Sequence, residues 1–166
     1  MKLVALSELI PDAKVDLRYA TTNNFTGKLL YTSPQDIIPK LEESAALALV
    51  QSSNRLRQQS LYIVIWDSYR PTAIQQQLRQ VNDDSDYVSE NSNHCRGLAI
   101  DITLMTSDGV YLDMGTDFDE FTPKAHADDR SINDVQQDNR QILKTAMESA
   151  GFKQWPYEWW HFDFVS

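Results

Sequence analysis

The chain has 166 residues, of which 42% are hydrophobic and 23% are charged, and this composition is typical of one folded domain and argues against disorder. Its formal net charge of −9 repels phosphate backbones and anionic lipids, so neither nucleic-acid nor membrane-surface partners are expected. The single cysteine, Cys95, excludes an internal disulfide bond. We therefore expect a single domain over residues 1–166 that lies in the cytoplasm, or in the periplasm if a signal peptide has been removed.

The first half of the chain predicts a helix, a buried strand and a second helix. Residues 39–59 begin with proline and carry a stripe of leucine and alanine at helical spacing. Residues 61–66 form a short apolar run rich in Ile, Val and aromatic residues, which is typical of a buried strand. Residues 71–81 again begin with proline and predict a helix. The polar residues 82–93 that follow predict a surface loop.

A strand with two different faces is predicted for residues 98–104. Leucine and isoleucine alternate there with smaller or polar residues, so that Asp101 lies on the face opposite the apolar stripe. A carboxylate on a half-buried strand costs free energy unless it is paired or bound to a cation. An Asp-Gly pair then predicts a hairpin turn into a second strand over residues 110–112.

The last third of the chain predicts one helix and one strand. The helix runs to residue 150, is capped by Asn133 or Asp134, and is followed by a glycine suited to ending it. Residues 159–164 are strongly aromatic and predict a final strand. Helices and antiparallel hairpins in this mixed order indicate an α+β domain.

Two of the three histidines fall in segments that suit a metal site. His94 precedes the strand that carries Asp101, and Gly97 between them allows a tight turn that brings the imidazole back toward the carboxylate. His161 follows three residues after Glu158. Imidazole and carboxylate ligands together suit zinc, and three protein ligands leave a fourth position for water, as in catalytic zinc sites. We therefore expect one zinc ion per chain.

Two further charged residues could take part in hydrolysis. Glu158 could be the general base that takes a proton from the water that zinc activates. Because residues three apart in a regular strand face opposite sides, Glu158 must precede the strand of His161 or be separated from it by a bulge. Arg70 follows the predicted strand 61–66 and could stabilise an oxyanion, with Asp67 holding its guanidinium.

Each of these residues also has a purely structural interpretation. A single histidine beside a strand is commonly a hydrogen-bonded structural residue. Asp67 and Arg70 alone could form a surface ion pair that contributes little to stability. The acidic residues 83–86 lack the glycine and distal glutamate of a calcium loop. The sequence shows no histidine that would pair with Cys95, so a thiol nucleophile is not expected.

Taken together, these segments resemble the D-alanyl-D-alanine dipeptidases of the VanX type, which are zinc peptidases related to the D,D-carboxypeptidases and to the hedgehog amino-terminal domain. Residues 92–101 fit the family signature SxHxxGxAxD at every position, residues 158–161 fit its second signature, and residues 66–71 fit its arginine motif. Residues 19–28 look like its amino-terminal stretch and residues 114–119 like its mid-chain motif. The resemblance covers nearly the whole chain.

The resemblance implies a role for each reactive side chain. His94, Asp101 and His161 would be the zinc ligands, Glu158 the catalytic base, and Arg70 the group that polarises the scissile carbonyl. The implied activity is zinc-dependent hydrolysis of the D-alanyl-D-alanine dipeptide, which is a compound of peptidoglycan metabolism.

The resemblance also implies how a substrate is held and which fold holds it. Asp119, with Tyr19, would receive the free ammonium group of a small D,D-dipeptide, and Ser92 would lie near its carboxylate. The implied fold is α+β, with helices on one side of a central antiparallel sheet and the zinc site on the other.

Two departures from the family pattern bear on the substrate. The loop between the helix 71–81 and His94 is shorter than in the best-known dipeptidases, and the sequence extends only five residues beyond His161. Both segments roof the cavity in the longer forms, so we expect a less covered cavity that admits longer substrates. Two alternatives therefore stay open: a D,D-carboxypeptidase or endopeptidase that acts on peptidoglycan stem peptides, and a non-catalytic zinc-binding module.

Overall fold

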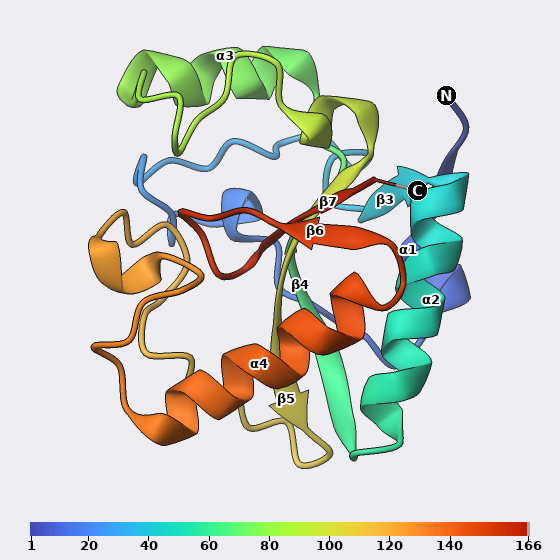
Figure 1. The fold of residues 1–166 in the computed structure, drawn as a ribbon. Coiled ribbons are helices and arrows are strands. Elements are labelled where there is room, and N and C mark those ends of the chain that lie inside the picture. Colours follow the sequence, from blue (N-terminus) through green and yellow to red (C-terminus); the bar gives the residue numbers. More distant parts are fainter. Residues whose placement is uncertain (166) are drawn as a thin grey trace.

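The computed structural model describes residues 1–165 and centres on a five-stranded sheet in the order β2–β4–β5–β7–β6 (Figure 1). All neighbouring strands in it are antiparallel except β2 and β4, which are parallel. Its strands are β2 (Lys14–Val15), β4 (Leu61–Asp67), β5 (Ala99–Thr106), β6 (Phe152–Gln154) and β7 (His161–Phe164). A separate antiparallel pair joins β1 (Leu3–Ala5) to β3 (Lys40–Glu42).

Two longer helices cover one face of the large sheet. The α-helices are α1 (Leu6–Leu9), α2 (Glu43–Arg57), α3 (Thr72–Val81) and α4 (Asp134–Glu148), and the 3-10 helices are η1 (Arg18–Ala20), η2 (Asn93–Arg96) and η3 (Pro123–Ala125). Helices α2 and α4 contact each other and pack against β4 and β6, whereas α3 lies apart from them at the top of the view in Figure 1. Among the described residues, no helix is both long and apolar enough to cross a bilayer.

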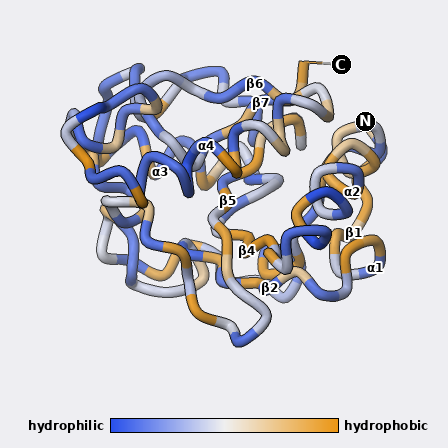
Figure 2. Tube along the Cα trace, turned by 60° about the horizontal axis from the view of Figure 1, so that its bottom comes forward, coloured by the Kyte–Doolittle hydropathy of each residue, from blue (hydrophilic) through white to orange (hydrophobic). Residues whose placement is uncertain are grey.

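The two faces of the sheet differ as the alternation in the sequence predicts. Ile65 pairs with Ile102 and Ile100 with Phe162, so these apolar residues share the face that α2 and α4 cover. Asp101 pairs with His161 on the opposite face. Figure 2 shows hydrophobic residues concentrated along β4, which lies next to the central strand β5. The predicted α+β class, with helices on one side and polar residues on the other, is confirmed.

Most of the predicted elements are present, although some boundaries differ. The strand 61–66, the helix 71–81 and the helix that ends near residue 150 are confirmed, and Asn133 caps the last of these through a reciprocal pair of hydrogen bonds with Gln136. The prediction that a helix begins at Pro39 is wrong. Residues Lys40–Glu42 form β3 instead, and the Glu42 carboxylate accepts a hydrogen bond from the Ser44 amide at 2.9 Å, which caps α2.

The predicted strands near the hairpin and the carboxyl terminus are shorter than expected. The turn forms, since the Thr106 amide donates to the Val110 carbonyl at 2.9 Å. Residues 110–112, however, make only a single bridge, between Tyr111 and Met105, so the prediction of a second strand there is wrong. The final strand begins at His161, because the two preceding tryptophans belong to a turn.

Gly97 lies where η2 meets β3, and its missing side chain allows this close approach. It ends η2 with φ +65°, and a Cβ built there would lie 2.8 Å from the Glu42 amide nitrogen. That amide cannot move away cheaply, because it donates a hydrogen bond to the Gly97 carbonyl at 2.8 Å.

We predict that Gly97→Ala lowers the free energy of unfolding by about 2–5 kcal/mol, since the left-handed backbone costs about 1–2 kcal/mol and the overpacking about 1–3 kcal/mol. Gly109→Ala is the matched control, because Gly109 has φ +80° but nothing within 4 Å of its added Cβ. Urea unfolding should show a loss of only about 1–2 kcal/mol for the control. Equal losses in the two variants would show that the contact with Glu42 is unimportant.

Candidate active site

The three predicted metal ligands come from three elements that meet at one end of β5. Asp101 lies in β5 and His161 is the first residue of β7 directly across from it, so their side chains share one face of the sheet. His94 is supplied by η2, which the Ser92 hydroxyl caps by accepting a hydrogen bond from the His94 amide at 3.3 Å. Gly97 then turns the chain into β5. The predicted turn back from His94 to Asp101 is therefore present.

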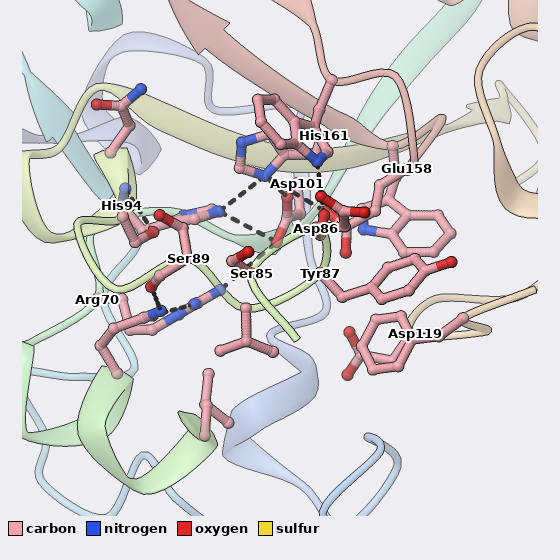
Figure 3. Close-up of a pocket in the computed structure, with 18 of the residues that line it drawn as sticks. Arg70, Ser85, Asp86, Tyr87, Ser89, His94, Asp101, Asp119, Glu158 and His161 are labelled. Carbon is pink, nitrogen blue, oxygen red and sulfur yellow. Dashed lines mark hydrogen bonds and ion pairs between the residues drawn. The ribbon is translucent and has the colours of Figure 1, made fainter. Parts of the chain in front are cut away.

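The ligand atoms of these three side chains lie within 4.8 Å of one another. His161 Nδ1 is 2.9 Å from Asp101 Oδ1, and His94 Nε2 is 3.3 Å from Asp101 Oδ2. The two ring nitrogens are 3.2 Å apart. Figure 3 shows both rings converging on Asp101, with Glu158 beside them.

Hydrogen bonds on the outer side of each ring orient the nitrogens that face inward. His94 Nδ1 donates to the Ser68 carbonyl at 2.7 Å, which turns its Nε2 toward Asp101. His161 Nε2 faces Asp163 Oδ1 at 3.2 Å. Such outer partners are typical of metal-binding histidines, because they fix the tautomer and the ring orientation. The donor set of two imidazoles and one carboxylate therefore fits zinc.

The charges of this cluster favour a cation at its centre. Burial opposes a charge on His161, but its hydrogen bonds to Asp101 and Asp163 raise the pKa of this imidazole well above its ordinary value. Burial likewise opposes a charge on Asp101, yet the two histidines lower the pKa of its carboxyl group below the ordinary value. A group of buried acceptors that attracts a proton this strongly would also attract a divalent metal ion.

Glu158 lies beside the cluster and before β7, which is one of the two arrangements that its spacing from His161 allows. Its side chain is 9% exposed, and its Oε2 lies 3.9 Å from His161 Nδ1. Burial raises the pKa of this carboxyl group well above its ordinary value. A carboxylate with a raised pKa is suited to accept and return a proton near neutral pH.

Arg70 is buried next to the cluster because β4 contains a bulge. The register between β4 and β5 shifts between Ile65 and Asp67, which places Asp67 opposite Asp101. Asp67 Oδ2 accepts hydrogen bonds from Arg70 Nε at 2.9 Å and from Nη2 at 2.7 Å. Arg70 Nη2 lies 3.8 Å from Asp101 Oδ2. The ion pair is thus buried, and the alternative interpretation of Asp67 and Arg70 as a surface pair is wrong.

Asp119 lies at another part of the same cavity (Figure 3), where it meets Tyr19. The Tyr19 hydroxyl donates to Asp119 Oδ1 at 3.3 Å, and the Phe25 amide donates to Oδ2 at 3.2 Å. Burial raises the pKa of Asp119 to about 8, and its backbone has φ +59°, a conformation that Asp tolerates better than most residues. This carboxyl group accepts two hydrogen bonds and forms no ion pair with any lysine or arginine in the described part of the chain.

All eight side chains to which the resemblance assigns a role line a single cavity of about 120 Å³. They are Tyr19, Arg70, Ser92, His94, Asp101, Asp119, Glu158 and His161. Cys95 is not among the lining residues, and burial raises the pKa of its thiol, so it has neither the position nor the acidity of a nucleophile.

The loop 82–93 lines the cavity, as the resemblance implies for the segment between the helix 71–81 and His94. The Tyr87 ring packs on Phe121 with centroids 4.8 Å apart, and Trp155 Nε1 donates to the Asp86 carbonyl at 2.8 Å. These contacts hold the short loop against the rest of the chain, and Figure 3 shows Ser85, Asp86, Tyr87 and Ser89 around the pocket.

Three residues of the site are not among those that the sequence predicts. Asp163 lies two residues after His161 on the same strand face, so period-two spacing could have identified it. Ser68 contributes only its backbone carbonyl, which no residue pattern reveals. Gln75 is a buried glutamine on α3, and its distance from Arg70 along the sequence does not indicate that the two side chains meet.

Comparisons with known proteins agree with this geometry. A family model described as peptidase M15, D-Ala-D-Ala dipeptidase, matches residues 1–166. A protein of Escherichia coli strain K12 named D-alanyl-D-alanine dipeptidase is 39% identical over 165 residues, which cover 98% of this chain and 84% of that protein.

Two solved structures share the fold. A vancomycin-resistance D,D-pentapeptidase, VanY, in complex with Zn(II) matches with a TM-score of 0.51 and 15% identity, over 77% of this chain and 74% of its own. The vancomycin-resistance D,D-dipeptidase VanXYg in complex with a D-Ala-D-Ala phosphinate analogue matches with a TM-score of 0.50 and 18% identity, over 99% of this chain and 67% of its own.

Proposed function

Since the chain belongs to the M15 peptidase family of D-Ala-D-Ala dipeptidases, we propose that it is a zinc-dependent enzyme that hydrolyses the D-alanyl-D-alanine dipeptide to two molecules of D-alanine. The observation that carries this proposal is the convergence of two imidazoles and a carboxylate, next to a buried glutamate and a buried arginine, on one small cavity. The complex of the related VanY fold with Zn(II) supports the choice of metal.

The metal would be held by His94, Asp101 and His161, and one ion would serve each chain. When bound, zinc supplies a Lewis acid for the scissile carbonyl and lowers the pKa of water to about 7. Ser68 and Asp163 would keep the two imidazole rings in the orientation that such binding needs.

The proton transfers would belong to Glu158. Its carboxylate would take a proton from the attacking water and deliver it to the amine that leaves. Burial raises the pKa of this carboxyl group, and a more basic carboxylate accepts the proton of the water more readily. Arg70 would stabilise the negative charge that develops on the carbonyl oxygen, since its guanidinium is already fixed in place by Asp67.

The substrate would be held at both of its charged ends. Asp119, with Tyr19, would bind the free ammonium group, and this cation would provide the counter-charge that the buried carboxyl group lacks. Ser92 would lie near the carboxylate of the dipeptide. A pocket that recognises the ammonium group selects a free dipeptide over the end of a longer peptide.

We predict that Glu158→Gln lowers kcat for D-Ala-D-Ala by roughly 10²- to 10⁴-fold while the bound zinc content is unchanged, because the amide preserves the shape but cannot accept the proton. Asp86→Asn is the matched control, since Asp86 is another carboxylate that lines the cavity but has no role in the proposed chemistry. Released D-alanine and the zinc content are measured for each variant. A Glu158→Gln enzyme as fast as the control would contradict the assignment of the base.

We also predict that the wild type hydrolyses D-Ala-D-Ala roughly 10- to 100-fold more efficiently than its N-acetylated form, because a hydrogen bond to a charged group is worth about 1.5–3 kcal/mol. Asp119→Asn should remove most of this preference. Asp117→Asn should retain it, since the Asp117 carboxylate lies 3.3 Å from Arg18 Nη1 instead.

The same assay tests the alternative of a D,D-carboxypeptidase. If the wild type prefers the N-acetylated dipeptide or a stem pentapeptide, that alternative replaces the dipeptidase. If neither substrate is turned over while zinc still binds and stabilises the fold, the chain is a non-catalytic zinc-binding module.

A further inference from the structure

Gln75 is a buried polar side chain, 2% exposed, in the first turn of α3. Its Oε1 accepts a hydrogen bond from Arg70 Nη1, and its Nε2 donates to the Ser89 carbonyl of the loop 82–93 at 2.6 Å. The amide of Gln75 therefore joins the arginine of the site to the loop that lines the cavity. When both the oxygen and the nitrogen of a buried amide form hydrogen bonds, the amide restrains the positions of both partners.

The contacts of Arg70 with Asp67 do not by themselves fix the orientation of its guanidinium. The hydrogen bonds from Nε and Nη2 both end on the same oxygen, Oδ2, while the other oxygen of Asp67 accepts from the Tyr31 hydroxyl. A planar group held at one point can still pivot about that point. The bond from Nη1 to Gln75 adds a second point of attachment and removes this freedom.

The orientation of the guanidinium decides where its remaining donors point. An arginine has five N–H groups, and the contacts with Asp67 and Gln75 use three of them, one each on Nε, Nη1 and Nη2. One N–H stays available on each of the two terminal nitrogens. Arg70 lines the cavity, and its Nη2 lies 3.8 Å from Asp101 Oδ2, so the Nη2 donor is close to one of the proposed metal ligands.

We propose that Gln75 is a positioning residue that orients the Arg70 guanidinium toward the carbonyl oxygen of the substrate and ties it to Ser89. The inference rests on the proposed function insofar as Arg70 stabilises the oxyanion. Stabilisation of this kind depends on donors that are aimed before the reaction begins, because a misplacement of about 1 Å can reduce the rate roughly 10²-fold.

Arg79 offers a matched control on the same helix. It lies four residues after Gln75, one turn along the same face of α3, and its Nη1 donates to the Val88 carbonyl. Both side chains thus fasten neighbouring carbonyls of the loop 82–93, but only Gln75 contacts Arg70. A role in holding the loop alone would make the two residues equivalent.

The first measurement compares Gln75→Leu, Gln75→Glu and Arg79→Met as zinc-loaded enzymes on D-Ala-D-Ala. We expect Gln75→Leu to lower kcat by roughly 10- to 100-fold with little change in KM. Gln75→Glu keeps the acceptor for Arg70 and should recover most of this loss. Arg79→Met should keep a kcat close to that of the wild type. Equal kcat values for Gln75→Leu and Arg79→Met, or a Gln75→Glu enzyme as slow as Gln75→Leu, would overturn the proposal.

The second measurement needs no turnover, so it separates the inference from the proposed function. Arginine side-chain ¹⁵N NMR detects rotation about the guanidinium bonds, and the signals of Arg70 are assigned by their loss in Arg70→Lys. In the wild type and in Arg79→Met we expect slow rotation, and therefore separate resonances for the two Nη atoms of Arg70. In Gln75→Leu we expect faster rotation, and therefore a single averaged Nη resonance. Unchanged signals in Gln75→Leu would overturn the inference even in an active enzyme, whereas a wild type that is inactive on the dipeptide would refute only the proposed function.

Discussion

The site depends on a cluster of carboxyl groups around one cavity, whose negative charges cost free energy unless they are protonated or paired with a cation. Five of the described residues that line the cavity are acidic, and Arg70 is the one permanent cation among them. Asp101 lies between two imidazoles whose inner nitrogens are 3.2 Å apart, and burial makes each of these charges costly unless it is compensated. Three cations would each compensate part of this negative charge: a metal ion between the two imidazoles, an ammonium group at Asp119 and the guanidinium of Arg70.

The sheet explains how segments far apart in the sequence supply this site. The pleat of β5 separates the apolar face under α2 and α4 from the face of Asp101, and antiparallel pairing places His161 directly opposite that aspartate. The bulge in β4 brings Asp67, and with it Arg70, to the same place. Because each of these side chains is on or next to a strand, the geometry of the cavity is fixed by the sheet, while the loop 82–93 covers it.

Much of this could be predicted from the sequence, for identifiable physical reasons. The alternation around Asp101 predicts a strand with two faces, and the resemblance of residues 92–101 and 158–161 to a known family identifies the residues that meet there. The start of α2 could not be predicted, because pairing of β3 with β1 overrides the helical pattern of Pro39 and Leu41. Gln75 could not be predicted either, since its role depends on a loop carbonyl 14 residues away in the chain.

The central claim is that one zinc ion is bound by His94, Asp101 and His161, and X-ray absorption at the zinc edge tests it most directly. We predict one zinc per chain with two imidazole nitrogens and carboxylate or water oxygens at about 2.0–2.2 Å, and the loss of one imidazole from this set in His94→Ala. A sulfur neighbour at about 2.3 Å, which only Cys95 or a methionine could supply, or an unchanged spectrum in His94→Ala, would contradict it.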